Sequence, residues 1–266
     1  MLLLHGFPQH SGMWQQVSRP LHAAGFRTIA PDQRGYSAGA RPADVRSYRM
    51  AECVADAVAM LDELGLDSVH VVGHDWGAIV GWFLAARYPD RIRTLTAISV
   101  PHPAAFAEAL NHGLDQRLKS SYVALFRRRH IAERLLLAGD AALLRFQCTA
   151  SGLPASVVDD YVDPLTEPGA LTAALSWYRA MSLAEFRTLE PVGCPTTYVW
   201  SDRDRAIGRY AAQRCGAHVA GPYRYIELPR VSHWIADVAP ESLANAIIDR
   251  ATVLALPDPP PAADPE

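Results

Sequence analysis

The chain is short of lysine, of net charge and of long apolar runs, and each shortage excludes a class of partner. Only Lys119 among its 25 basic side chains is a lysine, and 28 acidic residues leave a formal net charge of −3. A charge so close to balance gives no strong attraction to nucleic acid or to an anionic membrane. We attribute the preference for arginine over lysine to genomic composition and give it no functional weight.

Cysteine is also scarce, and its placement carries little information. Cys53, Cys148, Cys194 and Cys215 are scattered without Cys-x-x-Cys spacing. This pattern indicates reduced thiols rather than a disulfide framework or a metal site. No apolar run reaches the ~18 residues that a membrane span needs, and the apolar start of the chain is too short for a signal peptide. We therefore expect a cytoplasmic protein without membrane or nucleic-acid partners.

Along most of its length the sequence alternates between strand-like and helical segments. Its 266 residues, half of them hydrophobic, suffice for one large α/β domain. Strands are expected at Leu2–His5, Phe26–Pro31, Ser68–His74, Thr94–Val100, Thr196–Ser201 and Tyr223–Leu228. Helices are expected between most of them, at Met50–Leu64, Trp76–Tyr88, Arg209–His218 and Glu241–Leu254. This alternation predicts a mostly parallel sheet with helices on both faces.

The alternation breaks between residues 100 and 196, where only helices are expected. The clearest are Phe106–Asn111, Leu118–Arg128, Ile131–Ala138 and Leu171–Met181. An all-helical insertion between two strands is best interpreted as a cap over the carboxyl edge of the sheet. The predicted organisation is a core over residues 1–101 and 188–256, a cap over residues 102–187 and a Pro-rich disordered tail over residues 257–266.

The clearest chemical signal is the pentapeptide Gly73–Gly77, which reads Gly-His-Asp-Trp-Gly. It joins a Val-rich strand to a buried helix, which is the context of a nucleophile elbow. Its glycines let strand and helix approach closely, while Asp75 takes a strained conformation at the centre. A carboxylate is ionised at neutral pH, so Asp75 can displace at a saturated carbon and form an ester. The alternative is that Asp75 only caps the following helix.

Groups that would work with Asp75 follow other strands. His5–Pro8 ends the first strand, where the N–H of Phe7 can point to the elbow beside the N–H of Trp76 and form an oxyanion hole. His233 follows the last strand and can activate a water as general base. The orienting acid is expected after Thr196–Trp200, where we favour Asp204 over its neighbour Asp202.

These segments resemble the epoxide hydrolase branch of the α/β-hydrolase superfamily, which implies the α/β-hydrolase fold. The resemblance rests on His5–Pro8, Pro31–Tyr36, Gly73–Gly77, Ser201–Asp204 and Ser232–Trp234. It also implies two cap tyrosines that hydrogen-bond the epoxide oxygen. Tyr178 lies in Ser-Trp-Tyr-Arg, where the family usually has Asn-Trp-Tyr-Arg. Tyr122 resembles the other tyrosine, with Phe126 at the family's aromatic position, although such a pair on a helix can also be simple packing.

The mechanism implied by the resemblance has two steps and needs no cofactor. Asp75 attacks an epoxide carbon while Tyr122 and Tyr178 protonate the leaving alkoxide. Water activated by His233, which Asp204 orients, then hydrolyses the ester within the oxyanion hole. The expected substrate is a small apolar epoxide, with Phe126 and Trp177 in its pocket. A homodimer is left open.

Three alternatives were weighed against this interpretation. A haloalkane dehalogenase uses the same aspartyl ester, but resemblance to that family would predict Asn where this chain has Phe7, and no pair of cap tyrosines. A non-catalytic binding protein has no need of a complete set of Asp75, Asp204 and His233. Gly35–Gly39 matches the serine form of the elbow, but no helix follows Ser37.

One departure from the resemblance concerns the edge of the sheet. Family members normally carry a β-hairpin before the strand that ends in His-Gly, whereas this sequence starts at that strand, so either the true start lies upstream or the hairpin is missing. In the second case Phe26–Pro31 would present a bare sheet edge.

Overall fold

The computed structural model describes residues 1–252, so the predicted Pro-rich tail lies outside the described residues. A five-stranded sheet in the order β1-β2-β3-β4-β5 forms its centre, and every neighbouring pair is parallel. The strands are β1 (Leu2–Leu4), β2 (Val69–His74), β3 (Ile92–Ile98), β4 (Thr196–Ser201) and β5 (Tyr223–Leu228). The predicted α/β architecture with a parallel sheet is confirmed.

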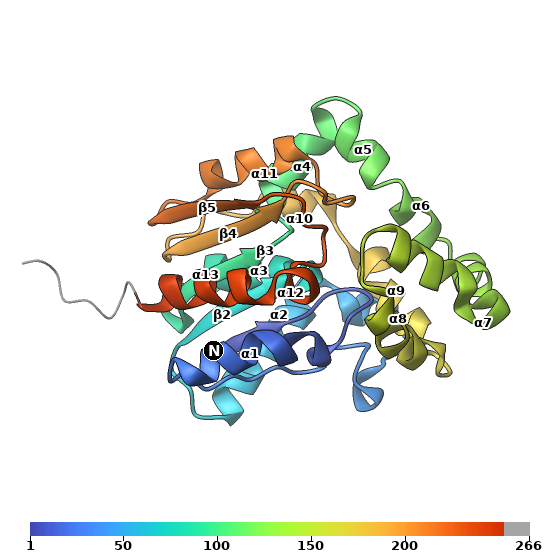
Figure 1. The fold of residues 1–266 in the computed structure, drawn as a ribbon, viewed down its shortest axis with the longest axis horizontal. Coiled ribbons are helices and arrows are strands. Elements are labelled where there is room, and N and C mark those ends of the chain that lie inside the picture. Colours follow the sequence, from blue (N-terminus) through green and yellow to red (C-terminus); the bar gives the residue numbers. More distant parts are fainter. Residues whose placement is uncertain (253–266) are drawn as a thin grey trace, which may run out of the picture.

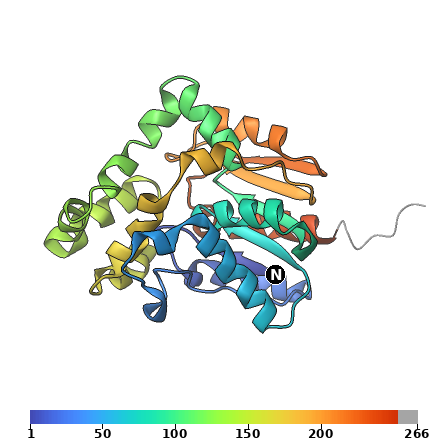
Figure 2. The ribbon, with the colours of Figure 1, turned by 180° about the vertical axis from the view of Figure 1, so that it is seen from behind.

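Helices cover both faces of this sheet. One face carries α1 (Gln15–Ala23), α12 (Ile235–Val238) and α13 (Pro240–Thr252), as Figure 1 shows. The opposite face, seen from behind in Figure 2, carries α2 (Met50–Glu63) and α3 (Trp76–Arg87). Every residue of α3 from Trp76 to Ala85 is buried, because the helix lies between the strands and α2. The sequence predicted this buried helix correctly. The short helix α11 (Arg209–Arg214) precedes β5.

The prediction of a strand over Phe26–Pro31 is wrong. This segment forms a single parallel bridge, between Ile29 and Leu2. Two hydrogen bonds accompany it, from Leu3 N–H to the Ile29 carbonyl and from Ile29 N–H to the Met1 carbonyl, both 2.8 Å long. The partner strand β1 is only three residues long, so there is no room for a longer ladder. Within the described residues the segment lies along the β1 edge of the sheet.

Seven helices follow β3 before the chain returns to the sheet at β4. They are α4 (Pro103–Asn111), α5 (Asp115–Lys119), α6 (Tyr122–Phe126), α7 (Ile131–Ala150), α8 (Ala155–Val162), α9 (Ala170–Ala180) and α10 (Leu183–Arg187). Helices α5 to α9 lie beyond one end of the strands in Figure 1. The helix expected over Leu118–Arg128 is split at Ser120 and Ser121, and α7 is kinked where Ala138–Ala141 leave helical geometry.

Within residues 1–252 no helix is long and apolar enough to cross a membrane.

Candidate active site

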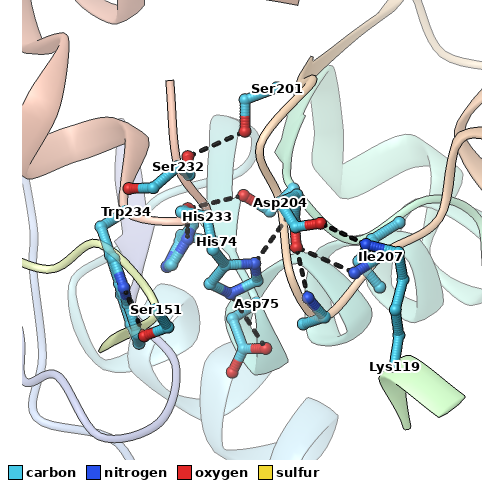
Figure 3. Close-up of polar contacts among 12 residues, drawn as sticks. His74, Asp75, Lys119, Ser151, Ser201, Asp204, Ile207, Ser232, His233 and Trp234 are labelled. Atoms are coloured by element: carbon cyan, nitrogen blue, oxygen red, sulfur yellow. Dashed lines mark hydrogen bonds and ion pairs between the residues drawn. The ribbon is translucent and has the colours of Figure 1, made fainter. Parts of the chain in front are cut away.

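The carboxyl ends of four strands bring together the side chains and amides that the sequence singled out. Phe7 follows β1, Asp75 follows β2, Asp204 follows β4 and His233 follows β5. All four residues are buried. Figure 3 shows His233 between the carboxylates of Asp75 and Asp204. The parallel sheet places these residues together because its strands all end at the same edge.

The elbow has the close packing that its glycines predicted. A side chain on Gly77 would place Cβ 2.0 Å from the Leu4 carbonyl oxygen, and one on Gly73 would lie 2.2 Å from the Gly77 oxygen. Asp75 has φ 52° and ψ −118°, a conformation that L-residues rarely adopt. Its side chain makes no capping hydrogen bond to α3, so the alternative of a simple helix cap is wrong. The carboxylate instead accepts a hydrogen bond from the segment that follows β1.

Asp75 faces an amide donor and the imidazole of His233. The N–H of Phe7 donates to Asp75 Oδ1 at 3.0 Å, and His233 Nε2 lies 3.6 Å from Asp75 Oδ2. Burial would raise the pKa of Asp75, but His233, His74 and the Trp76 amide together hold it below its ordinary value. The site therefore contains an ionised carboxylate at neutral pH.

His233 is held by Asp204 on its other side. Its Nδ1–H donates to Asp204 Oδ2 at 2.8 Å. The other carboxylate oxygen accepts the N–H groups of Ala206 at 2.7 Å and Ile207 at 2.8 Å. Burial would lower the pKa of His233, but the two carboxylates raise it well above its ordinary value. Asp202 is exposed and accepts from the Arg230 N–H instead, so Asp204 is the acid that reaches the imidazole.

Three residues that the sequence did not assign hold the backbone around His233. The His233 carbonyl accepts from His74 Nε2–H and from the Ser99 hydroxyl, both at 2.9 Å. Ser201 Oγ donates to the carbonyl of Ser232 at 2.8 Å. Burial, followed by the neighbouring His233, lowers the pKa of His74 to about 4, so its ring stays neutral. The sequence offered only one indication of this role, which is that His74, Ser99 and Ser201 all lie where a strand ends.

The two predicted cap tyrosines share their cavities with Asp75. Tyr122 of α6 and Tyr178 of α9 border two cavities, of about 310 and 380 Å³, and Asp75 borders both. The rings of the two tyrosines lie edge to face with centroids 6.1 Å apart. Burial raises the pKa of each phenol above its ordinary value, so both remain protonated donors. Phe126 lines the first cavity, with its ring centroid 5.0 Å from that of Tyr178.

Trp177, expected in the substrate pocket, borders neither of these cavities. Its indole N–H donates to the Arg34 carbonyl at 2.8 Å, and its ring packs against Trp76 at 5.6 Å. A residue next to Tyr178 on a helix points to a different side, which explains the difference. Ser37, at the centre of the serine-type pattern, also lies outside both cavities.

No part of residues 1–252 gathers three His, Cys, Asp or Glu side chains in the way a metal ion would require. All four cysteines are buried and form no disulfide. His70 and His74, four residues apart, bind different partners, the hydroxyl of Thr94 and the carbonyl of His233.

Comparisons with known proteins agree with this fold. The family model described as alpha/beta hydrolase fold matches residues 1–240. The AB hydrolase superfamily protein YfhM of Bacillus subtilis is 35% identical over 94% of this chain and 88% of its own length. Epoxide hydrolase 4 of mouse is 30% identical, over 93% of this chain and 71% of its length. A Bacillus megaterium epoxide hydrolase solved with an inhibitor superposes with a TM-score of 0.84 at 26% identity, covering 95% of this chain and 93% of that one.

Proposed function

Because the chain belongs to the α/β-hydrolase fold family, we propose that it is an epoxide hydrolase that converts apolar epoxides into vicinal diols. The observation that carries the proposal is an ionised Asp75 that faces two protonated cap tyrosines across shared cavities. A nucleophile on one side and proton donors on the other are what opening a strained C–O bond requires. The similarity to epoxide hydrolases from mouse and Bacillus megaterium supports the same conclusion.

In the first step Asp75 forms an ester with the substrate. A carboxylate oxygen attacks one epoxide carbon, the C–O bond of the ring breaks, and the oxygen leaves as an alkoxide. Tyr122 or Tyr178 gives this alkoxide a proton. The transfer is favourable because an alkoxide is far more basic than a phenolate.

In the second step water cleaves the ester. His233 takes a proton from the water, which attacks the ester carbonyl carbon, while the N–H groups of Phe7 and Trp76 stabilise the oxyanion. Each such donor contributes roughly 3 kcal/mol of transition-state stabilisation. The ester C–O bond then breaks, and the leaving diol oxygen takes a proton from the imidazolium. Asp75 retains an oxygen atom from the water and returns that hydroxyl's proton to His233. The Phe7 N–H already contacts Asp75 Oδ1 in the unreacted site.

Formation of the ester also prepares His233 for its task. Asp75 is one of the two carboxylates that raise the pKa of His233. An ester carries no charge, so esterification removes that contribution and lowers the imidazole pKa. The proton that His233 then gives up balances the proton that a tyrosine gave to the alkoxide. The imidazole thus becomes neutral when a base is needed.

A single-turnover experiment in ¹⁸O-water tests the proposal. Excess enzyme reacts with styrene oxide, and mass spectrometry follows both the diol and the peptide that contains Asp75. We expect first-turnover diol with mostly ¹⁶O, and ¹⁸O in the Asp75 carboxylate. Labelled diol with an unlabelled peptide would mean direct attack by water and would remove Asp75 as nucleophile. Halide release from a haloalkane, with no diol from a panel of epoxides, would replace the proposal with dehalogenation.

A further inference from the structure

The turn that carries Asp204 is held from the cap as well as from the core. Lys119 Nζ, at the end of α5, donates to the backbone carbonyl of Asp204 at 2.6 Å. Figure 3 shows this side chain reaching the turn from α5. Lys119 is the only lysine in the sequence. Lys119, which no sequence motif singled out, therefore contacts Asp204, the residue that orients the imidazole of His233.

Gln116, one turn earlier on α5, binds the same stretch of chain. Its Nε2 donates to the Ala206 carbonyl at 2.7 Å, and its Oε1 accepts from the Gly208 N–H at 2.8 Å. The second N–H of Gln116 Nε2 donates to the Ser120 hydroxyl at 2.9 Å. Both N–H groups and the oxygen of this amide are therefore hydrogen-bonded. Gln116 is only 2% exposed, and a buried amide satisfied in this way holds its partners in one geometry.

Close packing allows these contacts. A side chain on Gly208 would place Cβ 2.2 Å from Asp115 Oδ2, so the turn lies directly against α5. The same turn forms a wall of the substrate site, since Ala206 borders both cavities that contain Asp75 and Ile207 borders one. The helix that holds the turn thus meets the cavity wall and the acid together.

We propose that Gln116 and Lys119, together called the α5 clamp, are positioning residues through which the cap fixes Asp204 against His233 for ester hydrolysis. The inference rests on the proposed function. The turn's own amides and His233 already occupy the Asp204 carboxylate, whereas the outward carbonyls of Asp204 and Ala206 depend on the clamp. Without it these carbonyls lose their donors and the turn relaxes.

The two catalytic steps distinguish this role from a general structural one. Ester formation needs Asp75 and the tyrosines, whereas ester hydrolysis needs a correctly oriented His233. Loss of the clamp should therefore slow hydrolysis about tenfold or more while ester formation changes by less than about twofold, because small misplacements of catalytic groups are costly. The enzyme would accumulate the Asp75 ester.

The variants are Lys119→Met, Gln116→Met and the double variant, followed by rapid quenching and mass spectrometry of the Asp75 peptide. Lys119→Arg keeps a donor and should restore most of the hydrolysis rate. Arg128→Met is the matched control, because it removes one exposed cap charge near α6 without touching the turn. Unchanged ester hydrolysis in the double variant, or equal loss of both steps, would overturn the proposal.

A second measurement keeps the clamp testable if the chain opens no epoxide. Hydrogen exchange at the amides of Ala206, Ile207 and Gly208 should accelerate in the Lys119→Met and Gln116→Met variants, and stay unchanged in Arg128→Met. Wild-type protein without epoxide turnover would refute the proposed function alone. Unchanged exchange at these amides would refute the clamp alone.

Discussion

His233 lies between two carboxylates that do different work. Asp204 holds Nδ1 at 2.8 Å, whereas Asp75, the proposed nucleophile, is 3.6 Å from Nε2. A shorter contact with Asp75 would compete with attack on the substrate. In the proposed mechanism, this spacing lets His233 stay beside Asp75 and act only after Asp75 has become an ester.

Two substitutions should separate the steps that these residues serve. In His233→Gln the ester should form and persist, so the Asp75 peptide gains the mass of the epoxide. In Tyr178→Phe ester formation itself should slow by ~10²-fold, because the alkoxide loses a proton donor. Rapid-quench mass spectrometry of both variants measures this contrast. An ester that turns over normally in His233→Gln would remove His233 as the base.

The sequence predicted that most residues of the candidate site lie together, because position within the fold determines this. Asp75, Asp204 and His233 each follow a strand, and strands of a parallel sheet end at one edge. The contacts of Trp177 and Lys119 could not be predicted, for the opposite reason. Which way an indole faces in the cap, and which carbonyl a long lysine side chain reaches, depend on tertiary packing that residue patterns do not encode.

At the scale of secondary structure, the crossing of β1, β2 and α3 controls the site. Gly73 and Gly77 leave no space for a methyl group, so the N-terminus of α3 lies directly on the two strands. This contact fixes the position of Asp75 relative to the N–H of Phe7. The position of Asp75 therefore depends on this backbone packing.

Gly77→Ala should destabilise the protein by about 2–3 kcal/mol although alanine favours helix, because its methyl group would overlap the Leu4 carbonyl. Urea unfolding measures the change. Gly39→Ala is the control, since nothing lies within 4 Å of a side chain at that position, and it should stay within about 0.5 kcal/mol. A Gly77→Ala protein as stable as wild type would mean that the elbow can relax.

Elements with strong periodicity were predicted well, and short or interrupted ones were not. The bounds of β4 and β5 match the expectation, whereas Phe26–Pro31 pairs through one bridge because β1 ends after three residues. No helix was expected at α1, which contains Pro20, a residue that removes a helical hydrogen bond. The helix forms because Val17 and Leu21 are buried in the core.

At the scale of the whole molecule, a partly buried carboxylate joins α12, α8 and the segment after β1. Asp237 of α12 accepts from Gln9 Nε2 at 2.6 Å and from the Tyr161 hydroxyl of α8 at 2.7 Å. Burial raises the pKa of Asp237 to about 6 although both hydrogen bonds oppose the shift. Gln9 follows the turn His5–Pro8 after β1, so this contact links that turn with α8 and with α12, which follows the loop of His233.

Asp237 should make stability depend on pH. Its pKa is higher in the folded protein than in the unfolded chain, so the fold binds this proton more tightly and loses stability as pH rises from about 4 through 6. An asparagine at this position does not titrate, so Asp237→Asn does not lose this stability. Between pH 4.5 and pH 8 its free energy of unfolding should rise by about 1–2 kcal/mol relative to that of the wild type. The unpartnered Gln9 Oε1 can accept from the new amide.

Urea unfolding of both proteins at the two pH values tests this expectation. Asp249→Asn, which alters an exposed ion pair with Arg224, is the control and should show no comparable gain. A stability difference between Asp237→Asn and wild type that is the same at both pH values would place the titration elsewhere.

The solitary lysine has a practical consequence for anyone who handles the protein. Lys119 is the only side-chain amine in the sequence, and it binds the carbonyl of Asp204. Amine-reactive resins, dyes and crosslinkers that attach to a lysine side chain can therefore attach only here. Immobilisation through this amine would remove its hydrogen bond to the Asp204 carbonyl. The four cysteines are buried, so they offer no accessible thiol instead. A cysteine introduced on an exposed face far from α5 would be the safer point of attachment.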